Sequence, residues 1–195
     1  MARAGVTPER VESVAAAVVD EDGWDTLTLA AVAGRLGVSV PSLYKHVDGI
    51  AGVRRALTLR AVTELGRRLV DAAVGRAGRD ALGPMADAYR GFAREHPGLY
   101  AATVVAPAPG DDEHHAASDR VLMPVLAMID GYGVPSDQAI DAARALRATL
   151  HGFVSLELAG GFGLPVDVDT SFDRTVAGLD RALSTWPSSR TRPTA

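Results

Sequence analysis

Residues 28–47 read TLAAVAGRLGVSVPSLYKHV, and this stretch sets the fold of the N-terminal part of the chain. Thr28 is a typical helix N-cap, and the apolar residues after it recur with helical spacing as far as Gly37, which suits a turn. Only two residues separate Gly37 from a second short helix, which we expect to begin after Ser39 as N-cap and to run to the end of the stretch. Two helices joined by so short a turn must cross steeply. The spacing therefore predicts a helix-turn-helix over about residues 29–48.

The second helix of this motif is predicted to carry polar side chains on its outer face. Leu43 and Val47 are four residues apart and would both face the core. The DNA major groove, about 12 Å wide, admits a helix of this kind. The residues left to meet DNA on this spacing are Val40, Ser42, Lys45 and His46. The alternative is that the segment only builds a small helical subdomain with Tyr44 in its core.

Helical spacing of apolar residues continues along nearly the whole chain. The first helix is expected to follow Thr7 as N-cap with Pro8 as its first residue, and to end at Gly23. Further helices are expected over about residues 50–74, 80–95, 99–105, 112–131, 136–159 and 170–186. Ser136 is expected to be the N-cap of the penultimate helix. No segment has the sustained period-2 alternation of a strand. The chain is therefore predicted to be all-α, with about nine helices.

The length and the residue patterns predict two domains and a tail. The chain has 195 residues, which fits one ordinary domain or a small domain joined to a larger one. We place a smaller domain over residues 7–68 and a larger one over residues 69–186. Residues 187–195 are Pro, Ser, Thr and Arg almost throughout and have no apolar pattern, so we expect a disordered tail there.

The composition excludes sulfur chemistry and leaves nucleic acid open as a partner. The chain has no Cys, so disulfides, thiolate metal sites and Cys nucleophiles are excluded. A net charge of −4 argues against phosphate binding on average, but residues 34–68 hold seven basic residues and only two acidic ones. The single Lys of the chain, Lys45, falls on the predicted recognition helix. No stretch reaches the roughly 18 apolar residues of a membrane span, and residues 1–20 lack the apolar run of a signal peptide, so we expect a cytoplasmic protein.

Three runs of residues carry a resemblance to a known family: Thr28-Leu29-Ala30-Ala31-Val32-Ala33, Leu36-Gly37-Val38-Ser39 with Pro41, and Leu43-Tyr44-Lys45-His46-Val47. At these spacings residues 7–68 resemble the DNA-binding domain of the tetracycline-repressor-like (TetR) family of bacterial regulators. The resemblance implies that Tyr44 and His46 contact phosphates, and that Val40, Pro41 and Ser42 approach bases. The full set of DNA contacts that it implies is Thr28, Ser39, Val40, Pro41, Ser42, Tyr44, Lys45, His46 and Arg54. The chain has Ile50-Ala51 where the family usually has Lys-Glu, so Arg54 or Arg55 would replace a lysine contact to phosphate.

The second half of the chain resembles the regulatory domain of the same family. Residues 148–158 are similar to a His-Gly-containing helix found in one subgroup of these regulators. In the family, the last two long helices of two subunits form a four-helix dimer contact, and the 4-3-4 spacing of apolar residues in the last helix agrees with this. The residues expected at that contact are Leu150, Val154, Phe172, Val176, Leu179 and Leu183. The alternative is that both helices are ordinary core within one chain.

Ligand binding is expected in the core of this second domain, because a pocket needs mostly apolar walls and a few convergent polar groups. The residues that fit are Tyr89, Phe92, Tyr100, Met128, Arg147 and His151. For each of them, packing in the core or in an interface is the alternative interpretation.

Two further clusters do not predict a site. The run Asp111-Asp112-Glu113-His114-His115 holds residue types that bind metals, but adjacent residues point apart on a helix, and acidic residues suit a helix N-terminus. The run Gly160-Gly161-Phe162-Gly163 follows a helix instead of opening one, so it indicates a helix C-terminus and not a phosphate loop. We therefore expect no metal and no cofactor.

Together these inferences predict a homodimeric, ligand-responsive transcriptional repressor. Two recognition helices would enter successive major grooves of double-stranded DNA, about 34–36 Å apart on a pseudo-palindromic operator. A small-molecule effector would release the DNA, with the long helix over residues 50–74 carrying the movement. One alternative is an activator with the same parts, and another is a helical small-molecule carrier or enzyme with a vestigial helix-turn-helix. The sequence does not identify the effector, the operator or the target genes.

Overall fold

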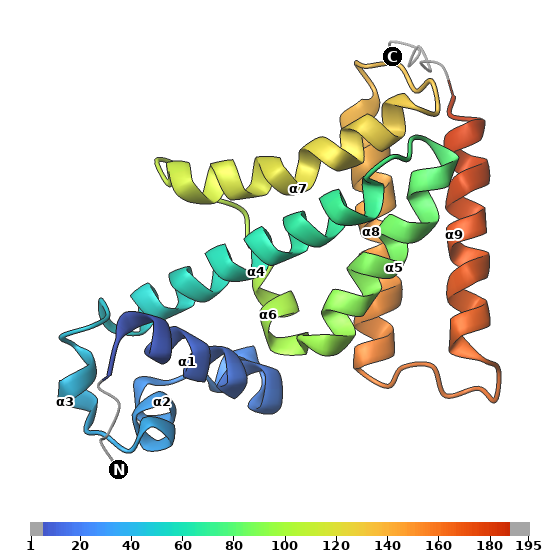
Figure 1. Cartoon of the computed structure of the whole chain (residues 1–195). Coiled ribbons are helices and arrows are strands. Elements are labelled where there is room, and N and C mark those ends of the chain that lie inside the picture. Colours follow the sequence, from blue (N-terminus) through green and yellow to red (C-terminus); the bar gives the residue numbers. More distant parts are fainter. Residues whose placement is uncertain (1–5, 188–195) are drawn as a thin grey trace, which may run out of the picture. The chain divides into compact units, whose positions relative to one another are not determined.

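The computed structural model describes residues 6–187, and every regular element in that range is helical (Figure 1). The elements are α1 (Pro8–Asp22), a 3₁₀ turn η1 (Trp24–Thr26), α2 (Leu29–Leu36), α3 (Val40–Leu43), α4 (Gly49–Ala73), α5 (Arg79–Glu95), α6 (Pro97–Ala102), α7 (Asp112–Asp130), α8 (Ala139–Leu158) and α9 (Val168–Ser184). The all-α prediction is confirmed. The predicted tail, apart from Pro187, lies outside the described residues.

The predicted N-cap residues of α1 and α2 form the expected capping hydrogen bonds. The Thr7 side chain accepts a hydrogen bond from the backbone N–H of Arg10 at 3.3 Å, and the Thr28 side chain accepts one from the N–H of Ala31 at 3.1 Å. Each bond satisfies a backbone donor that a helix N-terminus leaves without an intrahelical partner. At the other end of α2, Gly37 has a left-handed φ of 69°, which a side chain would strain. These contacts fix where α1 and α2 begin and where α2 ends.

Several predicted boundaries are wrong, including those of α6, which spans Pro97–Ala102 and not residues 99–105. The helix after Ser39 ends at Leu43, because the N–H of His46 bonds the carbonyl of Leu43 three residues back, in a tighter turn than an α-helix makes. α8 begins at Ala139, and Ser136 belongs to the turn before it, so Ser136 is not the N-cap. α9 begins at Val168 because Asp167 accepts a hydrogen bond from the Thr170 N–H at 2.6 Å and caps the helix early.

The described residues form two compact units, and each unit is built from two separate stretches of sequence. Unit 1 comprises the residues up to 65 together with 92–118, and unit 2 comprises residues 66–91 together with those from 119 onward. Residues 92–118, which the sequence analysis assigns to the ligand-binding domain, therefore pack with the N-terminal residues. The long helices α4, α5 and α7 each contribute residues to both units.

Unit 1 groups α1, α2 and α3 around the first turns of α4, and α6 packs on α1 (Figure 1). Its core includes Val11, Val18, Val32, Leu43 and Leu57, each with at most 1% of its surface exposed. Burial of these side chains is the main favourable contribution to folding, at roughly 1.5–3 kcal/mol for each fully buried residue. The helix-turn-helix is thus built on a closed apolar core.

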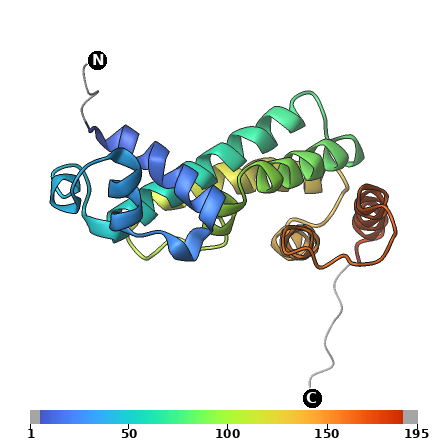
Figure 2. The same ribbon diagram turned by 90° about the horizontal axis from the view of Figure 1, so that it is seen from below.

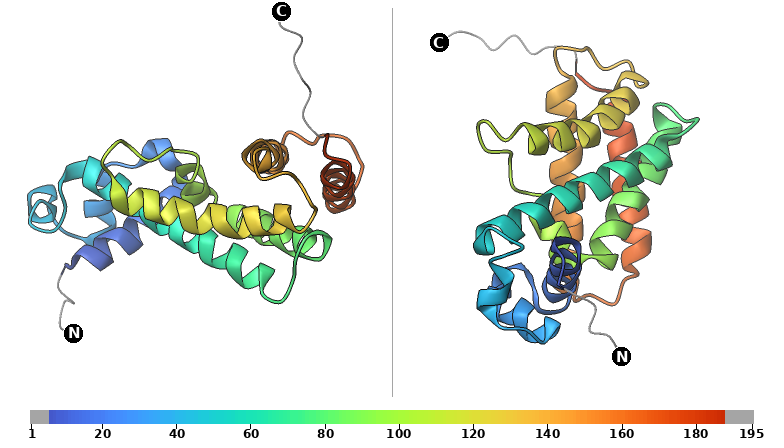
Figure 3. Two further views of the ribbon diagram at one scale, coloured as in Figure 1. Left: turned by 90° about the horizontal axis from the view of Figure 1, so that it is seen from above. Right: turned by 60° about the vertical axis from the view of Figure 1, so that its left-hand side comes forward.

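Unit 2 is centred on α8 and α9, which lie side by side and are seen end-on in Figure 2 and in the left view of Figure 3. Their facing sides bury Leu150, Val154, Phe172 and Leu183. Phe172 also meets Phe153 of α8 edge to face, with ring centroids 5.2 Å apart. The two helices therefore share an apolar seam within one chain.

Candidate nucleic-acid interface and sensing core

The helix-turn-helix presents its last segment outward because one residue anchors it. Leu43 is fully buried, whereas the next residue, Tyr44, has 62% of its surface exposed, and Lys45 is exposed as well. The alternative in which Tyr44 forms the core of a subdomain is therefore wrong. Tyr44, Lys45 and His46 lie in the turn after α3 and not within it. Lys45 makes no ion pair with any residue in the range 6–187, so its charge faces solvent.

The short polar residues of the motif are partly occupied by local contacts. Ser39 occupies the N-cap position of α3, but its Oγ makes no capping hydrogen bond and instead lies 2.9 Å from Oγ of Ser42. Thr28 uses its hydroxyl to cap α2. Val40 is half-buried and Pro41 is exposed, and Val47, expected to face inward, is only half-buried. From Ser39 onward, the predicted contact residues of the motif therefore lie on one continuous segment that ends at His46.

The two arginines considered as replacements for a family lysine differ in their surroundings. The guanidinium of Arg54 lies 5.7 Å from the centre of the Trp24 ring, and its Nε is buried without a hydrogen-bond partner among the described residues. Arg55 is paired with two carboxylates, Asp111 at 2.7 Å and Glu113 at 2.9 Å. The Arg55 guanidinium lowers the pKa of Asp111 to about 2. A phosphate would therefore compete with two carboxylates for Arg55.

A joint between α1 and α6 could not be predicted from the local residue pattern. One carboxylate oxygen of Asp20 accepts hydrogen bonds from the backbone N–H groups of Gly98 and Leu99, both at 3.0 Å. The other oxygen lies 3.0 Å from Nδ1 of His96. His96 occupies the N-cap position of α6 but gives it no capping hydrogen bond from its side chain. The absence of a good capping residue before Pro97 was the available signal that another element supplies the cap.

The residues expected to bind a ligand do not share one environment. Tyr89 and Met128 are buried in unit 2, and Phe92 and Tyr100 are buried in unit 1. His151 is half-buried, with its ring nitrogens 3.4 Å from Oγ of Ser155. Arg147, in contrast, is exposed on α8, so the expectation that it lies in the core is wrong.

Sequence analysis also missed Arg90, a buried cation that joins three helices of unit 2. Its residue is only 8% exposed. The guanidinium forms two hydrogen bonds to Glu157 of α8, at 2.8 Å and 2.5 Å, and one to Asp169 of α9 at 2.6 Å. It also lies over the Phe172 ring, 4.6 Å from its centre. The available signal was its place on the apolar face of α5, four residues after Ala86.

The residues predicted for dimerisation are mostly core of a single chain. Leu150, Val154, Phe172, Leu179 and Leu183 are each at most 9% exposed, and Val176 is half-buried. The apolar stripe of α9 faces α8 of the same chain, and its expected contact with a second copy stays a prediction. The outward face of α8 instead exposes Ala145, Ala148, Gly152 and Leu156.

The two clusters set aside by sequence have local structural roles. Asp111 accepts a hydrogen bond from the His114 N–H at 3.1 Å at the start of α7, as expected for a helix N-terminus. Gly160 follows α8 with a left-handed φ of 68°, which confirms the predicted C-terminus. In the described range, no group of three or more His, Asp or Glu side chains is placed to hold a metal ion. None of the helices between residues 6 and 187 is long and apolar enough to span a membrane.

Comparison with known proteins finds similarity over most of the chain. The family described as tetracyclin repressor-like, C-terminal domain, matches residues 82–179. An uncharacterized HTH-type transcriptional regulator of Mycobacterium tuberculosis is 39% identical over 183 residues, which are 91% of this chain and 84% of that protein.

Solved structures share the fold. A protein of unknown function from Rhodococcus superposes with a TM-score of 0.77 and 25% identity, over 93% of this chain and 97% of that one. A TetR variant from Acinetobacter baumannii, solved in complex with minocycline, superposes with a TM-score of 0.69 and 21% identity, over 95% and 100% of the two chains.

Proposed function

We propose a function for this chain on the basis that it belongs to the tetracycline-repressor-like (TetR) family of transcriptional regulators, as the family match over residues 82–179 and the 39% identical relative show. The chain acts as a homodimeric repressor that binds a pseudo-palindromic operator through two helix-turn-helix motifs and releases it when a small molecule binds. Its role is to regulate transcription and not to catalyse a reaction, and it acts in the cytoplasm.

The observation that carries DNA binding is the burial of Leu43 next to the exposed Tyr44 and Lys45. An apolar anchor holds the end of α3, so the polar residues after it project from a fixed base. Tyr44 and His46 supply phosphate contacts, which fix the register of the protein on the duplex, and Lys45 contacts a phosphate or a base edge. Val40, Pro41 and Ser42 approach base edges, and an apolar contact to a thymine methyl suits Val40 or Pro41.

Among the remaining contacts, Thr28 and Ser39 approach the backbone of DNA near the motif. Arg54 takes the place of the usual lysine, and Arg55 does not, because two carboxylates already hold the Arg55 guanidinium. The Trp24 ring beside the Arg54 guanidinium limits its rotation. A charged side chain held in one position loses less conformational entropy when it binds a phosphate.

A second copy binds through the outward faces of α8 and α9. The exposed residues Ala145, Ala148 and Gly152 lie along one face of α8, where short side chains let a second helix approach closely. Leu156 adds an exposed apolar side chain at the end of the same face. The buried seam between α8 and α9 keeps these two helices together, so the dimer contact rests on a rigid pair. Two such chains would present recognition segments about 34–36 Å apart on the DNA.

The effector binds in the core of unit 2. Tyr89, Met128 and His151 of this unit supply two apolar walls and one polar group. The solved relative from Acinetobacter baumannii holds minocycline, which supports a small molecule as the effector class. A coupling of about 1–3 kcal/mol between the effector and DNA sites would be enough for release. The helix α4 carries this coupling, since it contributes residues to both units.

The test begins with selection of DNA bound by the full chain from a random pool. Affinity of the selected site is then measured for wild type, Lys45→Ala and Tyr44→Ala at several salt concentrations. Both variants should bind more weakly, and each phosphate interaction that a variant removes should reduce the salt slope by about one. Arg76→Ala is the control, because it removes an exposed positive charge outside the motif. Unchanged affinity and salt slope in both variants would refute DNA binding by this segment.

An activator remains a second form of the same proposal, since it uses the same parts. A reporter placed behind the selected operator distinguishes the two, because a repressor lowers transcription from it and an activator raises transcription. A carrier or enzyme with a vestigial helix-turn-helix would select no DNA at all.

A further inference from the structure

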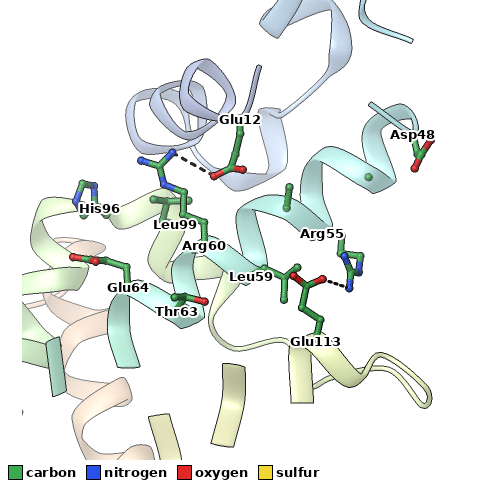
Figure 4. Close-up of a pocket in the computed structure, with 12 residues that line it drawn as sticks. Glu12, Asp48, Arg55, Leu59, Arg60, Thr63, Glu64, His96, Leu99 and Glu113 are labelled. Carbon is green, nitrogen blue, oxygen red and sulfur yellow. Dashed lines mark hydrogen bonds and ion pairs between the residues drawn. The ribbon is translucent and has the colours of Figure 1, made fainter. Parts of the chain in front are cut away.

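A groove of about 770 Å³ lies along one face of α4, entirely within unit 1 (Figure 4). Its volume falls within the range of roughly 300–1,000 Å³ that small-molecule sites occupy. The floor is formed by one helical face with short and apolar side chains, which include Gly52, Ala56 and Leu59. Because these side chains are short, they leave a groove on the surface of α4 between the flanking elements α1 and α7.

The two sides of the groove each carry an acidic residue. Figure 4 shows Glu12 of α1 and Glu113 of α7 on opposite sides of α4. Asp48 and Glu64 also line it, so four carboxylates face the space against two guanidinium groups, those of Arg55 and Arg60. An anion entering the groove would meet a surplus of negative charge, whereas a cation would be attracted.

The two arginines differ in how firmly they are held. Arg55 makes three hydrogen bonds to Asp111 and Glu113, at 2.7–3.0 Å. Arg60 reaches Glu12 only at 3.5 Å, and both side chains of this pair are at least a third exposed. Exposed pairs of this kind contribute little to stability. A competing cation can therefore replace Arg60 at Glu12 at little cost, while the wall formed by Arg55 stays in place.

We propose that this groove binds a small organic cation with an apolar body. The body lies on Ala56 and Leu59, and an ammonium group displaces Arg60 from Glu12. A second ammonium group, where the molecule has one, faces the carboxylate of Asp48 or Glu113. The occupant contacts α1, α4 and α7 together, and its site shares no residue with the sensing core proposed for unit 2.

The binding test uses the full chain without DNA and three matched probes: 1,4-bis(aminomethyl)benzene, the neutral 1,4-benzenedimethanol and the anionic terephthalate. Titration by NMR should give saturable shifts of the Gly52 amide and the Leu59 methyl groups with the diamine. The diol and the dianion should bind at least tenfold more weakly. Equal binding of all three probes, or shifts confined to unit 2, would overturn the proposal.

Two variants test the residues. Glu12→Gln should weaken diamine binding at least fivefold, whereas Glu9→Gln on the same helix, outside the groove, should leave it unchanged. Ala56→Leu fills the floor and should abolish saturable binding without removing any charge. Diamine binding that survives both Glu12→Gln and Ala56→Leu would contradict the groove as the site.

A second readout rests on the proposed function. Saturating diamine should change the affinity of the wild-type chain for its selected operator at least threefold, and should have a smaller effect on Glu12→Gln. Saturable binding with no change in operator affinity would refute a regulatory role for the groove. A chain that binds the diamine but selects no DNA would refute the proposed function and leave the binding site supported.

Discussion

The carboxylate of Asp20 on α1 accepts a hydrogen bond from the backbone N–H of Gly98 at the start of α6, across 3.0 Å. The contact also depends on the absence of a side chain at Gly98. A Cβ there would overlap the backbone carbonyl of Val19, so only glycine lets the two helices approach this closely. Because the capping group of α6 belongs to α1, the start of α6 is tied to the helix on which α2 packs.

Replacing Asp20 by Ala should destabilise the chain by about 1–2 kcal/mol, the usual cost of removing a helix cap. The N–H groups of Gly98 and Leu99 would lose their acceptor, and α6 would fray from its start. Urea unfolding measures the free energy, and hydrogen exchange at the two amides locates the loss. Asp25→Ala serves as the control, because Asp25 is exposed in η1 and should change stability by less than about 0.5 kcal/mol. A cost for Asp20→Ala no larger than that of the control would contradict the joint.

Replacing Arg90 by Met should cost about 3 kcal/mol or more, because Glu157 would be left without its partner in a site where its side chain is only 16% exposed. Methionine keeps much of the side-chain volume of arginine. The loss of unfolding free energy would therefore come from the missing charge and not from a cavity. Arg79→Met is the matched control: Arg79 pairs with Asp180, but its side chain is 70% exposed, and the cost should stay within about 1 kcal/mol. Similar unfolding free energies for the two variants would argue against Arg90 as the connection between α5, α8 and α9.

The ion pair of Asp111 with Arg55 predicts a dependence of stability on pH. The folded pKa of Asp111 is lowered to about 2 from its usual 3.8, so the pair contributes its full stability above the unfolded pKa. That contribution is lost as the pH falls from about 4 to 2, where the carboxylate takes up a proton. The stability difference between wild type and Asp111→Asn should therefore be largest above about pH 5 and should shrink toward about pH 2, as measured by urea midpoints. A difference that stays constant over this range would contradict the assignment.

The proposed dimer face predicts the effect of a bulky charge on α8. A Cβ at Gly152 would meet nothing within 4 Å in one chain, so Gly152→Arg should leave the fold intact. In a dimer the same side chain would meet the second copy. The dimer dissociation constant, measured by sedimentation equilibrium, should therefore rise at least tenfold. Gly83→Arg, on α5, is the control, since a Cβ there also meets nothing within 4 Å. Dimers equally stable in both variants would exclude this face of α8.

Local patterns in the sequence were sufficient to predict the helices and the segment proposed to meet DNA. Thr7, Thr28, Gly23 and Gly37 stand at the ends of α1 and α2 as predicted, because caps and left-handed turns depend on contacts a few residues away. The exposure of Lys45 follows from the same local pattern, whereas the pattern alone left open whether Tyr44 is exposed or in the core. Local spacing also located the start of α7 and the end of α8.

Tertiary packing, in contrast, settled which apolar faces meet each other and which charges are paired. The stripe of α9 packs on α8 of the same chain, and periodicity alone cannot tell such a partner from a second copy. The contact of Asp20 with Gly98 and the burial of Arg90 between α8 and α9 join residues 67 or more positions apart. Such contacts depend on how distant segments pack, which the spacing of residues along a single helix does not specify.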